Sequence, residues 1–318
     1  MSKYHQLTQE ERYRITAHRM AGCTQAEIAR LLGRHRSTIG REVKRNATRH
    51  DGDYRAEKAH SYATAHRRRS RRGARFSAEQ MARVATLLRG KWSPEQISGT
   101  LRRTGEMLIS TETIYRRIRW DKQAGGSLWR HTRIMSNQRR KRYRGPDSRG
   151  VLPGKRHISE RPPEVEHRRR VGHWEGDTVM GSDAHHCVLT LVERKTGFAI
   201  IKKLKARTKD EVTRAATLAI RRHCRQFKTL TLDNGTEFHD YALLEERFPV
   251  KVYFATPYHS WERGSNENFN GLLRQYLPKG TCMRPVTQAQ CDQIADDLNN
   301  RPRKRLGFKT PAHQYHQH

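Results

Sequence analysis

The sequence has few of the features that mark secreted, zinc-binding or membrane proteins. Its five cysteines form no Cys-x-x-Cys pair, which excludes the usual zinc spacings, and their odd number and wide separation fit reduced thiols. No apolar run approaches the roughly 18 residues that cross a membrane, and no signal-peptide pattern begins the chain. We therefore expect a soluble, cytoplasmic protein with no membrane partner.

Acidic residues are scarce, and basic residues outnumber them. The chain has 32 Asp and Glu against 65 Lys and Arg, which gives a net charge of +33. Residues 1–170 hold 42 Lys and Arg but 16 Asp and Glu, a net charge of +26, whereas the remaining 148 residues carry +7. Because Lys and Arg neutralise phosphates and release condensed counterions, this composition indicates a nucleic-acid partner. A ribosomal component or a generally basic surface is the alternative.

Two short helices joined by a glycine turn are predicted within residues 1–50. Thr24 and Glu27 have the capping-box spacing, Gly33 permits a sharp turn, and a second helix is expected from Ser37 to Arg45. This pattern is typical of a helix-turn-helix, whose second helix enters the major groove of DNA. The residues expected at its groove-facing start are Arg34, Arg36, Ser37, Thr38 and Arg41. An ordinary helical hairpin with a solvated basic face is the alternative.

A second helix-turn-helix, with a longer turn, is predicted in residues 76–122. Ser93, Pro94 and Gln96 form a strong helix start, and another helix with a basic outer face follows residue 109. Its expected DNA-contact residues are Thr113, Arg116 and Arg117. A helical spacer with solvated arginines is the alternative. The basic segments 51–75 and 123–170 are interpreted as linkers that lie along the phosphate backbone.

From residue 171 the pattern changes to strands. The runs HWEGDTVMG, CVLTLVER and FAIIKKLK are apolar and rich in β-branched residues, and short polar turns separate them. A long helix from Thr208, the strands KTLTLDNG and KVYFATP, and two further helices follow. This β-β-β-α-β-α-β-α order predicts a mixed sheet with helices on its faces.

Three acidic residues of this region fall where a catalytic site could form. Asp177 lies on the first strand, Asp233 ends the strand KTLTL, and Glu267 lies one turn into a later helix. Active groups favour the carboxyl edge of such sheets, and a cluster of carboxylates suits two Mg²⁺ or Mn²⁺ ions acting on phosphodiesters. Without metal the carboxylates would repel one another. Other acids compete for these roles: Glu175, Glu237 and Glu262.

Four long motifs resemble those of a known family, and together with the N-terminal pattern the resemblance covers essentially the whole chain. They are WEGDTV, TLDNGTEF, PYHSWERGSNENFNGLLRQYLPKG and NNRPRKRLGFKTPAHQY. They resemble the insertion-sequence-thirty family of bacterial DDE transposases, including the gap of 33 residues between Asp233 and Glu267. The resemblance implies an α+β multidomain protein, in which all-α helix-turn-helix domains precede a ribonuclease-H-like mixed-sheet α/β catalytic core at residues 171–318.

The resemblance also implies roles for individual residues. Asp177, Asp233 and Glu267 would be the catalytic triad that binds two Mg²⁺ or Mn²⁺ ions, so the third position falls to Glu267 rather than Glu262. Arg274, seven residues after Glu267, would contact DNA near the cut. An ordinary surface arginine is the alternative for Arg274.

The function that follows is DNA transposition. Such a protein would bind the terminal inverted repeats of its element, nick a strand, form circles of abutted ends and insert them into target DNA. Joining two ends requires a homo-oligomer, at least a dimer on double-stranded DNA, in the bacterial nucleoid. The alternatives are a DNA-binding regulator with a non-catalytic core and a structure-specific nuclease resembling ribonuclease H.

Overall fold

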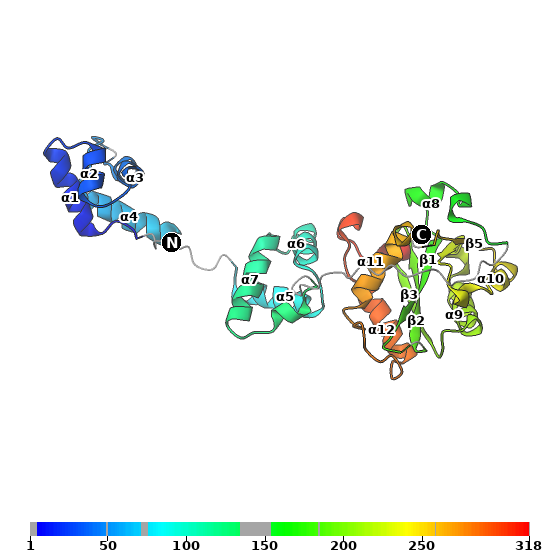
Figure 1. Cartoon of the computed structure of the whole chain (residues 1–318). Helices are drawn as coiled ribbons and strands as arrows, with labels where there is room; N and C mark the ends of the chain where they lie inside the picture. The colour runs from blue at the N-terminus through cyan, green and yellow to red at the C-terminus, as the bar shows by residue number, and fades with distance from the viewer. Residues whose placement is uncertain are drawn as a thin grey trace. The chain divides into compact units, whose positions relative to one another are not determined.

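The computed structural model describes residues 5–48, 50–70, 76–133, 154–183, 185–257 and 259–317. The chain divides into two compact units, Met1–Ser77 and Ala78–His318 (Figure 1). Parts of the two predicted linkers, residues 71–75 and 134–153, lie outside the described residues. Within the described residues, no helix has both the length and the apolar character needed to cross a membrane.

The first unit is a four-helix domain. It contains α1 (Gln9–Met20), α2 (Gln25–Leu31), α3 (Arg36–Asn46) and α4 (Ala56–Ser70). Thr8 and Thr24 form the capping boxes of α1 and α2, in which each hydroxyl accepts a backbone N–H and the third helical residue returns its carboxylate. The helices enclose a small apolar core that includes Ile15, Ile28, Ile39 and Val43.

Residues 51–75 differ from the linker that we expected. Most of the segment is the helix α4, which packs against α1 and α3. Tyr54 and Ala59 are buried in the core of the first unit, 2% and 0% exposed. The arginines at the end of the segment suggested a solvated chain, but the apolar side chains before them bury enough surface to fix a helix.

The second unit begins with three helices in the region where the second helix-turn-helix is predicted. They are α5 (Ala78–Arg89), α6 (Pro94–Arg103) and α7 (Thr111–Gln123), and the short 3₁₀ turn η1 (Leu128–His131) follows. Ser93 and Gln96 form a capping box at α6, and the Ser110 hydroxyl caps α7.

These helices contact the C-terminal part of the same unit. The Gln96 side chain donates to the Pro302 carbonyl at 2.8 Å and accepts from Arg301 Nε at 2.9 Å. Lys91 Nζ donates to the Gln275 carbonyl at 3.0 Å. The ring of Phe308 lies directly over Gly99, because a Cβ at that position would come within 2.2 Å of the ring. Residues 78–123 therefore pack against the sheet-containing part instead of forming a separate domain.

The contact at Gly99 gives a testable prediction. Gly99→Leu should lower the free energy of unfolding by about 1–3 kcal/mol, the usual cost of overpacking a close contact. Urea denaturation of the full chain measures this loss, and Arg102→Leu, on the exposed side of the same helix, is the matched control. Equal midpoints for the two variants would contradict the close packing of α6 on Phe308.

The second unit is built on a mixed five-stranded sheet of order β3-β2-β1-β4-β5. The strands are β1 (His173–Met180), β2 (Cys187–Glu193), β3 (Ala199–Leu204), β4 (Thr229–Leu232) and β5 (Lys251–Phe254). The first three pair antiparallel, and β1–β4 and β4–β5 pair parallel. This arrangement confirms the predicted element order and mixed sheet.

Helices cover both faces of the sheet. One apolar cluster joins the sheet to α9 (Lys209–Arg222), α10 (Ala242–Arg247) and α13 (Pro311–His316), and a second joins it to α11 (Gly264–Leu273) and α12 (Gln288–Asn299). A short helix, α8 (Glu164–His167), precedes β1. The remaining 3₁₀ turns are η2 (Ile158–Glu160), η3 (Cys224–Gln226), η4 (Thr236–Phe238), η5 (Ser260–Arg263) and η6 (Lys304–Leu306).

Candidate active site

Asp177 and Asp233 lie close together because β1 and β4 are parallel neighbours. Glu175 pairs with Thr231 in this ladder, so Asp177, two residues later, is level with the end of β4, where Asp233 follows directly. Side chains alternate along β1, and Asp177 therefore faces the same side of the sheet as Glu175, toward α11. Both aspartate side chains are partly exposed, at 23% and 26%.

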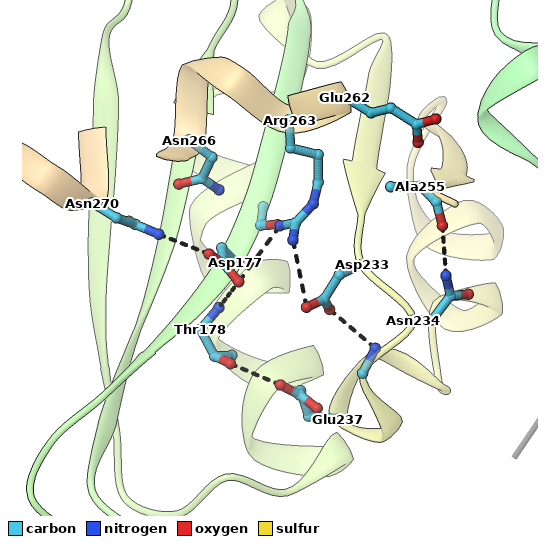
Figure 2. A network of polar contacts seen from close by, with 12 residues as sticks. Asp177, Thr178, Asp233, Asn234, Glu237, Ala255, Glu262, Arg263, Asn266 and Asn270 are labelled. Atoms are coloured by element: carbon cyan, nitrogen blue, oxygen red, sulfur yellow. Dashed lines mark hydrogen bonds and ion pairs between the residues drawn. The ribbon is translucent and has the colours of Figure 1, made fainter. Parts of the chain in front are cut away.

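The guanidinium of Arg263 lies between the two carboxylates (Figure 2). Its Nη1 is 3.5 Å from Asp177 Oδ1 and donates to the Gly176 carbonyl at 3.0 Å, and its Nη2 is 3.6 Å from Asp233 Oδ2. Arg263 ends the turn η5 immediately before α11. The site thus brings one positive charge to two negative charges at one edge of the sheet.

Asn270 of α11 holds the other oxygen of Asp177. Its side-chain N–H donates to Asp177 Oδ2 at 2.7 Å, and its oxygen lies 3.3 Å from the buried Thr190 hydroxyl of β2. Asp177 Oδ1 also accepts the Thr178 N–H at 3.0 Å. These contacts fix the orientation of the Asp177 carboxylate against both strands and the helix.

The environment of Asp177 disfavours its ionised form. Burial is the largest cause and raises the pKa of Asp177 to about 6, while the Arg263 guanidinium acts in the opposite direction and Asp233 raises the pKa further. A cation at this position therefore relieves an unfavourable charge. The carboxylate oxygens suit a hard divalent ion such as Mg²⁺ or Mn²⁺, and the Arg263 guanidinium shows that a positive charge is accommodated between them.

Glu267 is exposed on α11, three residues before Asn270, which reaches Asp177. Positions three apart are neighbours on a helix surface, whereas Arg263 precedes the helix and has a non-helical backbone. Within the described residues, no three His, Cys, Asp or Glu side chains are gathered closely enough to hold a metal ion. Among the described residues, the contacts of Arg263 join Asp177 and Asp233 but do not include Glu267.

Glu175 is not available as the auxiliary metal ligand that we considered. It is completely buried, forms an ion pair with Arg194 and accepts the Asn266 N–H at 2.9 Å. Asn266 lies in the first turn of α11, where backbone N–H groups lack helical partners. Glu175 therefore joins β1 to the helix that carries Glu267.

The other two competing acids are also engaged by the protein. Glu237 is 3% exposed and accepts from the Thr178 hydroxyl at 2.7 Å and from Arg207 Nε at 2.8 Å. Glu262 accepts the Thr256 N–H at 2.8 Å and points away from the aspartates (Figure 2). These contacts make Glu262 the anchor of the loop after β5.

Arg274 lies at the end of α11, where its guanidinium binds backbone carbonyls. Nη2 donates to Met180 at 2.9 Å and Nη1 donates to Leu277 at 3.3 Å. Arg274 is thus half-buried beside the end of β1, which differs from a freely solvated surface arginine.

The predicted DNA-contact residues of the first unit surround the start of α3. Arg36, Ser37 and Arg41 are exposed, and Thr38 is half-buried beside them. Arg34 instead forms an ion pair with Glu11 of α1 at 2.8 Å, so part of its role is internal to the domain.

On α7, the three predicted residues lie in the first two turns. Thr113 is half-buried at the Ser110 cap, Arg116 is exposed, and the Arg117 guanidinium lies 4.6 Å from the Trp120 ring. The structure therefore places an exposed basic group on α7.

Two contacts in the site were missed from the sequence. Arg263 and Asn270 both touch Asp177, yet we singled out neither. For Asn270 the signal was available in the helical spacing, since a residue three positions after Glu267 is its neighbour on the helix surface.

Comparison with known proteins identifies the two kinds of domain in the chain. A helix-turn-helix domain model matches residues 3–46, and an integrase core domain model matches residues 167–260. The chain is similar to the transposase for insertion sequence element IS4351 of Bacteroides fragilis, with 39% identity over 100% of this chain and 97% of that protein. It is also 39% identical to the transposase InsI for element IS30A of Escherichia coli strain K12, over 96% of this chain and 82% of that protein.

Among solved structures, the catalytic core domain of BIV integrase aligns with 46% of this chain and 95% of its own, at 20% identity and a TM-score of 0.37. The full-length relatives are transposases of insertion elements, and their similarity extends across both the helix-turn-helix and the integrase core. The chain belongs to the IS30 family of transposases, and it combines an N-terminal DNA-binding helix-turn-helix with a ribonuclease-H-like integrase core.

Proposed function

We propose that Asp177, Asp233 and Glu267 bind two divalent metal ions and that this site cleaves and joins DNA strands at the ends of an insertion element. The observation that carries the proposal is the position of the Arg263 guanidinium, a positive charge between Asp177 and Asp233 at the carboxyl edge of the sheet. When bound, Mg²⁺ or Mn²⁺ activates the attacking oxygen and stabilises the leaving oxygen of the phosphodiester. The three carboxylates would hold the ions.

The residues around the triad would position it. Asn270 orients Asp177 through its 2.7 Å hydrogen bond, and Glu175 ties the first turn of α11 to β1. Because α11 also carries Glu267, these two contacts set the distance between the acid on the helix and the aspartates on the strands. Arg274, at the other end of α11, would bind DNA near the cut.

DNA recognition would use both helix-turn-helix regions. The start of α3 presents Arg36, Ser37, Thr38 and Arg41, and α7 presents Thr113, Arg116 and Arg117. One helix in the major groove reads base edges, while neighbouring arginines bind phosphates. We propose that these surfaces bind the terminal inverted repeats and target DNA, and that at least two protomers join the two ends, as abutted-end circles require.

The test is incubation of the full chain with DNA that carries the element ends, with and without Mg²⁺. A transposase nicks the end and transfers the freed 3′-hydroxyl to a second phosphodiester. A regulator with a non-catalytic core would bind the same DNA and leave it intact. A ribonuclease-H-like nuclease would cut RNA–DNA hybrids or branched DNA without requiring the repeats.

The positioning role of Asn270 gives a separate prediction. Asn270→Ala should weaken Mn²⁺ binding and cleavage about 10- to 100-fold, the usual effect of removing a group that orients a metal ligand. Raising the Mg²⁺ concentration should recover part of the rate, because the carboxylates themselves remain. Cleavage measured against Mg²⁺ concentration tests this, and Asn300→Ala, exposed at the end of α12, is the control. Unchanged metal dependence would exclude the role.

A further inference from the structure

Arg263 is held at the aspartate pair by charge more than by hydrogen bonds. Its two contacts with Asp177 and Asp233 are 3.5 and 3.6 Å long, and its one closer contact is with the Gly176 carbonyl at 3.0 Å. Its side chain is only 12% exposed, and its Nε is buried without a hydrogen-bond partner. A buried donor that lacks a partner costs free energy, so this position is a compromise for Arg263.

Arg194 shows how a structural arginine is bound in the same domain. It is 3% exposed, and all three of its nitrogens have partners: Glu175, Glu166 at 3.0 Å and the Val165 carbonyl at 3.3 Å. Arg263 lacks such a set of partners. The comparison indicates that Arg194 is a permanent part of the fold, whereas Arg263 occupies a position that another cation can take.

Both oxygens of Asp177 have partners in this arrangement. Oδ2 accepts from Asn270 at 2.7 Å, and Oδ1 accepts from Thr178 at 3.0 Å while it faces Arg263. A divalent ion bound by Asp177 and Asp233 would lie beside the guanidinium, and two positive charges at that separation repel strongly where water is partly excluded. The ion and the guanidinium therefore compete for the same two carboxylates.

We propose that Arg263 is the internal counter-ion of the metal-free site and that divalent metal displaces it from Asp177 and Asp233. The inference rests on the proposed metal-binding role of these residues. In the metal-free protein the guanidinium offsets the repulsion between the two carboxylates. It also competes with metal, so that the protein binds divalent ions less tightly than the carboxylates alone would allow.

The test is the affinity of the DNA-free full chain for Mn²⁺, measured by titration calorimetry or by the electron paramagnetic resonance of free Mn²⁺. Arg263→Gln, which keeps most of the side-chain volume without the charge, should bind Mn²⁺ about tenfold more tightly than the unchanged protein. Its melting temperature in EDTA should fall, and its rise on adding Mn²⁺ should exceed that of the unchanged protein. Equal or weaker binding by Arg263→Gln would overturn the inference.

Two further variants separate this inference from the proposed function. Arg263→Lys keeps the positive charge and should bind Mn²⁺ more weakly than Arg263→Gln. Asp177→Asn should lose Mn²⁺ binding both alone and combined with Arg263→Gln. If Asp177→Asn binds Mn²⁺ normally, the proposed metal site is wrong. If Asp177→Asn loses binding but Arg263→Gln gains none, only the counter-ion role is wrong.

A measurement on the unchanged protein covers the case in which Arg263→Gln does not fold. In protein labelled with ¹⁵N-arginine, the Nε–H resonance of Arg263 is assigned by its absence from the spectrum of Arg263→Lys. This resonance should shift when Mg²⁺ is added in the absence of Mn²⁺. The resonance of Arg194 should stay in place, because its partners do not change. A resonance of Arg263 that does not respond while Mg²⁺ binds would overturn the displacement.

Discussion

Asp233→Asn will abolish strand cleavage and strand transfer while binding to element ends survives. The substitution keeps the size of the side chain and its hydrogen bond with the Gly235 N–H, but removes the charge that would hold metal. Losing about 4 kcal/mol of transition-state stabilisation corresponds to a rate loss of about 10³-fold. Single-turnover cleavage of end DNA measures the rate, and electrophoretic mobility shift measures binding.

The matched control is Asp296→Asn, an exposed aspartate on α12. It changes the net charge of the chain by the same amount, so it should leave both cleavage and binding within about twofold of the unchanged protein. Normal cleavage by Asp233→Asn would show that the triad assignment is wrong. Loss of DNA binding together with cleavage would instead show that Asp233 supports the fold or the DNA contact.

Glu175→Leu will destabilise the second unit more than any exposed substitution. It leaves the buried guanidinium of Arg194 with only the exposed Glu166 as a charged partner, and it removes the acceptor of the Asn266 N–H. Breaking one side of a buried ion pair costs about 3–5 kcal/mol. Urea denaturation of the metal-free protein measures the loss, and tryptophan fluorescence follows the unfolding of the second unit, because all five tryptophans lie in it.

Two variants show which part of that loss comes from charge. Glu166→Gln replaces the other acid bound to Arg194 with a neutral amide. Glu166 is 62% exposed and also pairs with the buried Arg161, so the loss should be smaller than for Glu175→Leu, because water solvates the exposed position. Glu175→Gln keeps an acceptor for Asn266 and should lie between the two. If Glu175→Leu and Glu166→Gln lower stability equally, the buried pair is not what holds α11 to the sheet.

The parts of the site that depend on local patterns were predictable from the sequence. Runs of apolar, β-branched residues predicted the strands. Asp233 directly follows one of these runs, which placed it at the carboxyl edge of the sheet. The pairing of β1 with β4 joins strands that are distant in the sequence, although the order of the elements favours it. This pairing brings Asp177 to the same edge as Asp233. The capping boxes at Thr8 and Thr24 were equally readable, because they need residues only three positions apart.

The contacts between distant residues could not be read in the same way. Arg263 and Asp177 are 86 positions apart. The local sequence around either residue does not indicate that a guanidinium lies between two aspartates. Glu175 looked like a possible ligand because it shares a strand face with Asp177, yet its burial against Arg194 depends on how α8, β1 and β2 pack. Burial of a charge is decided by the fold around it, which sequence spacing does not report.

The contact of α6 with the C-terminal part of the second unit fixes the distance between α7 and the aspartate site. Because Gln96 and Gly99 join the helices before the sheet to Pro302 and Phe308, the span from α7 to Asp233 is set by the protein. If α7 and the aspartate site act on DNA as proposed, the number of base pairs between the sequence that α7 contacts and the bond that is cut should therefore be constant. Inserting about five base pairs there, half a turn of B-DNA, should move the cut along with the α7 sequence and away from the element end.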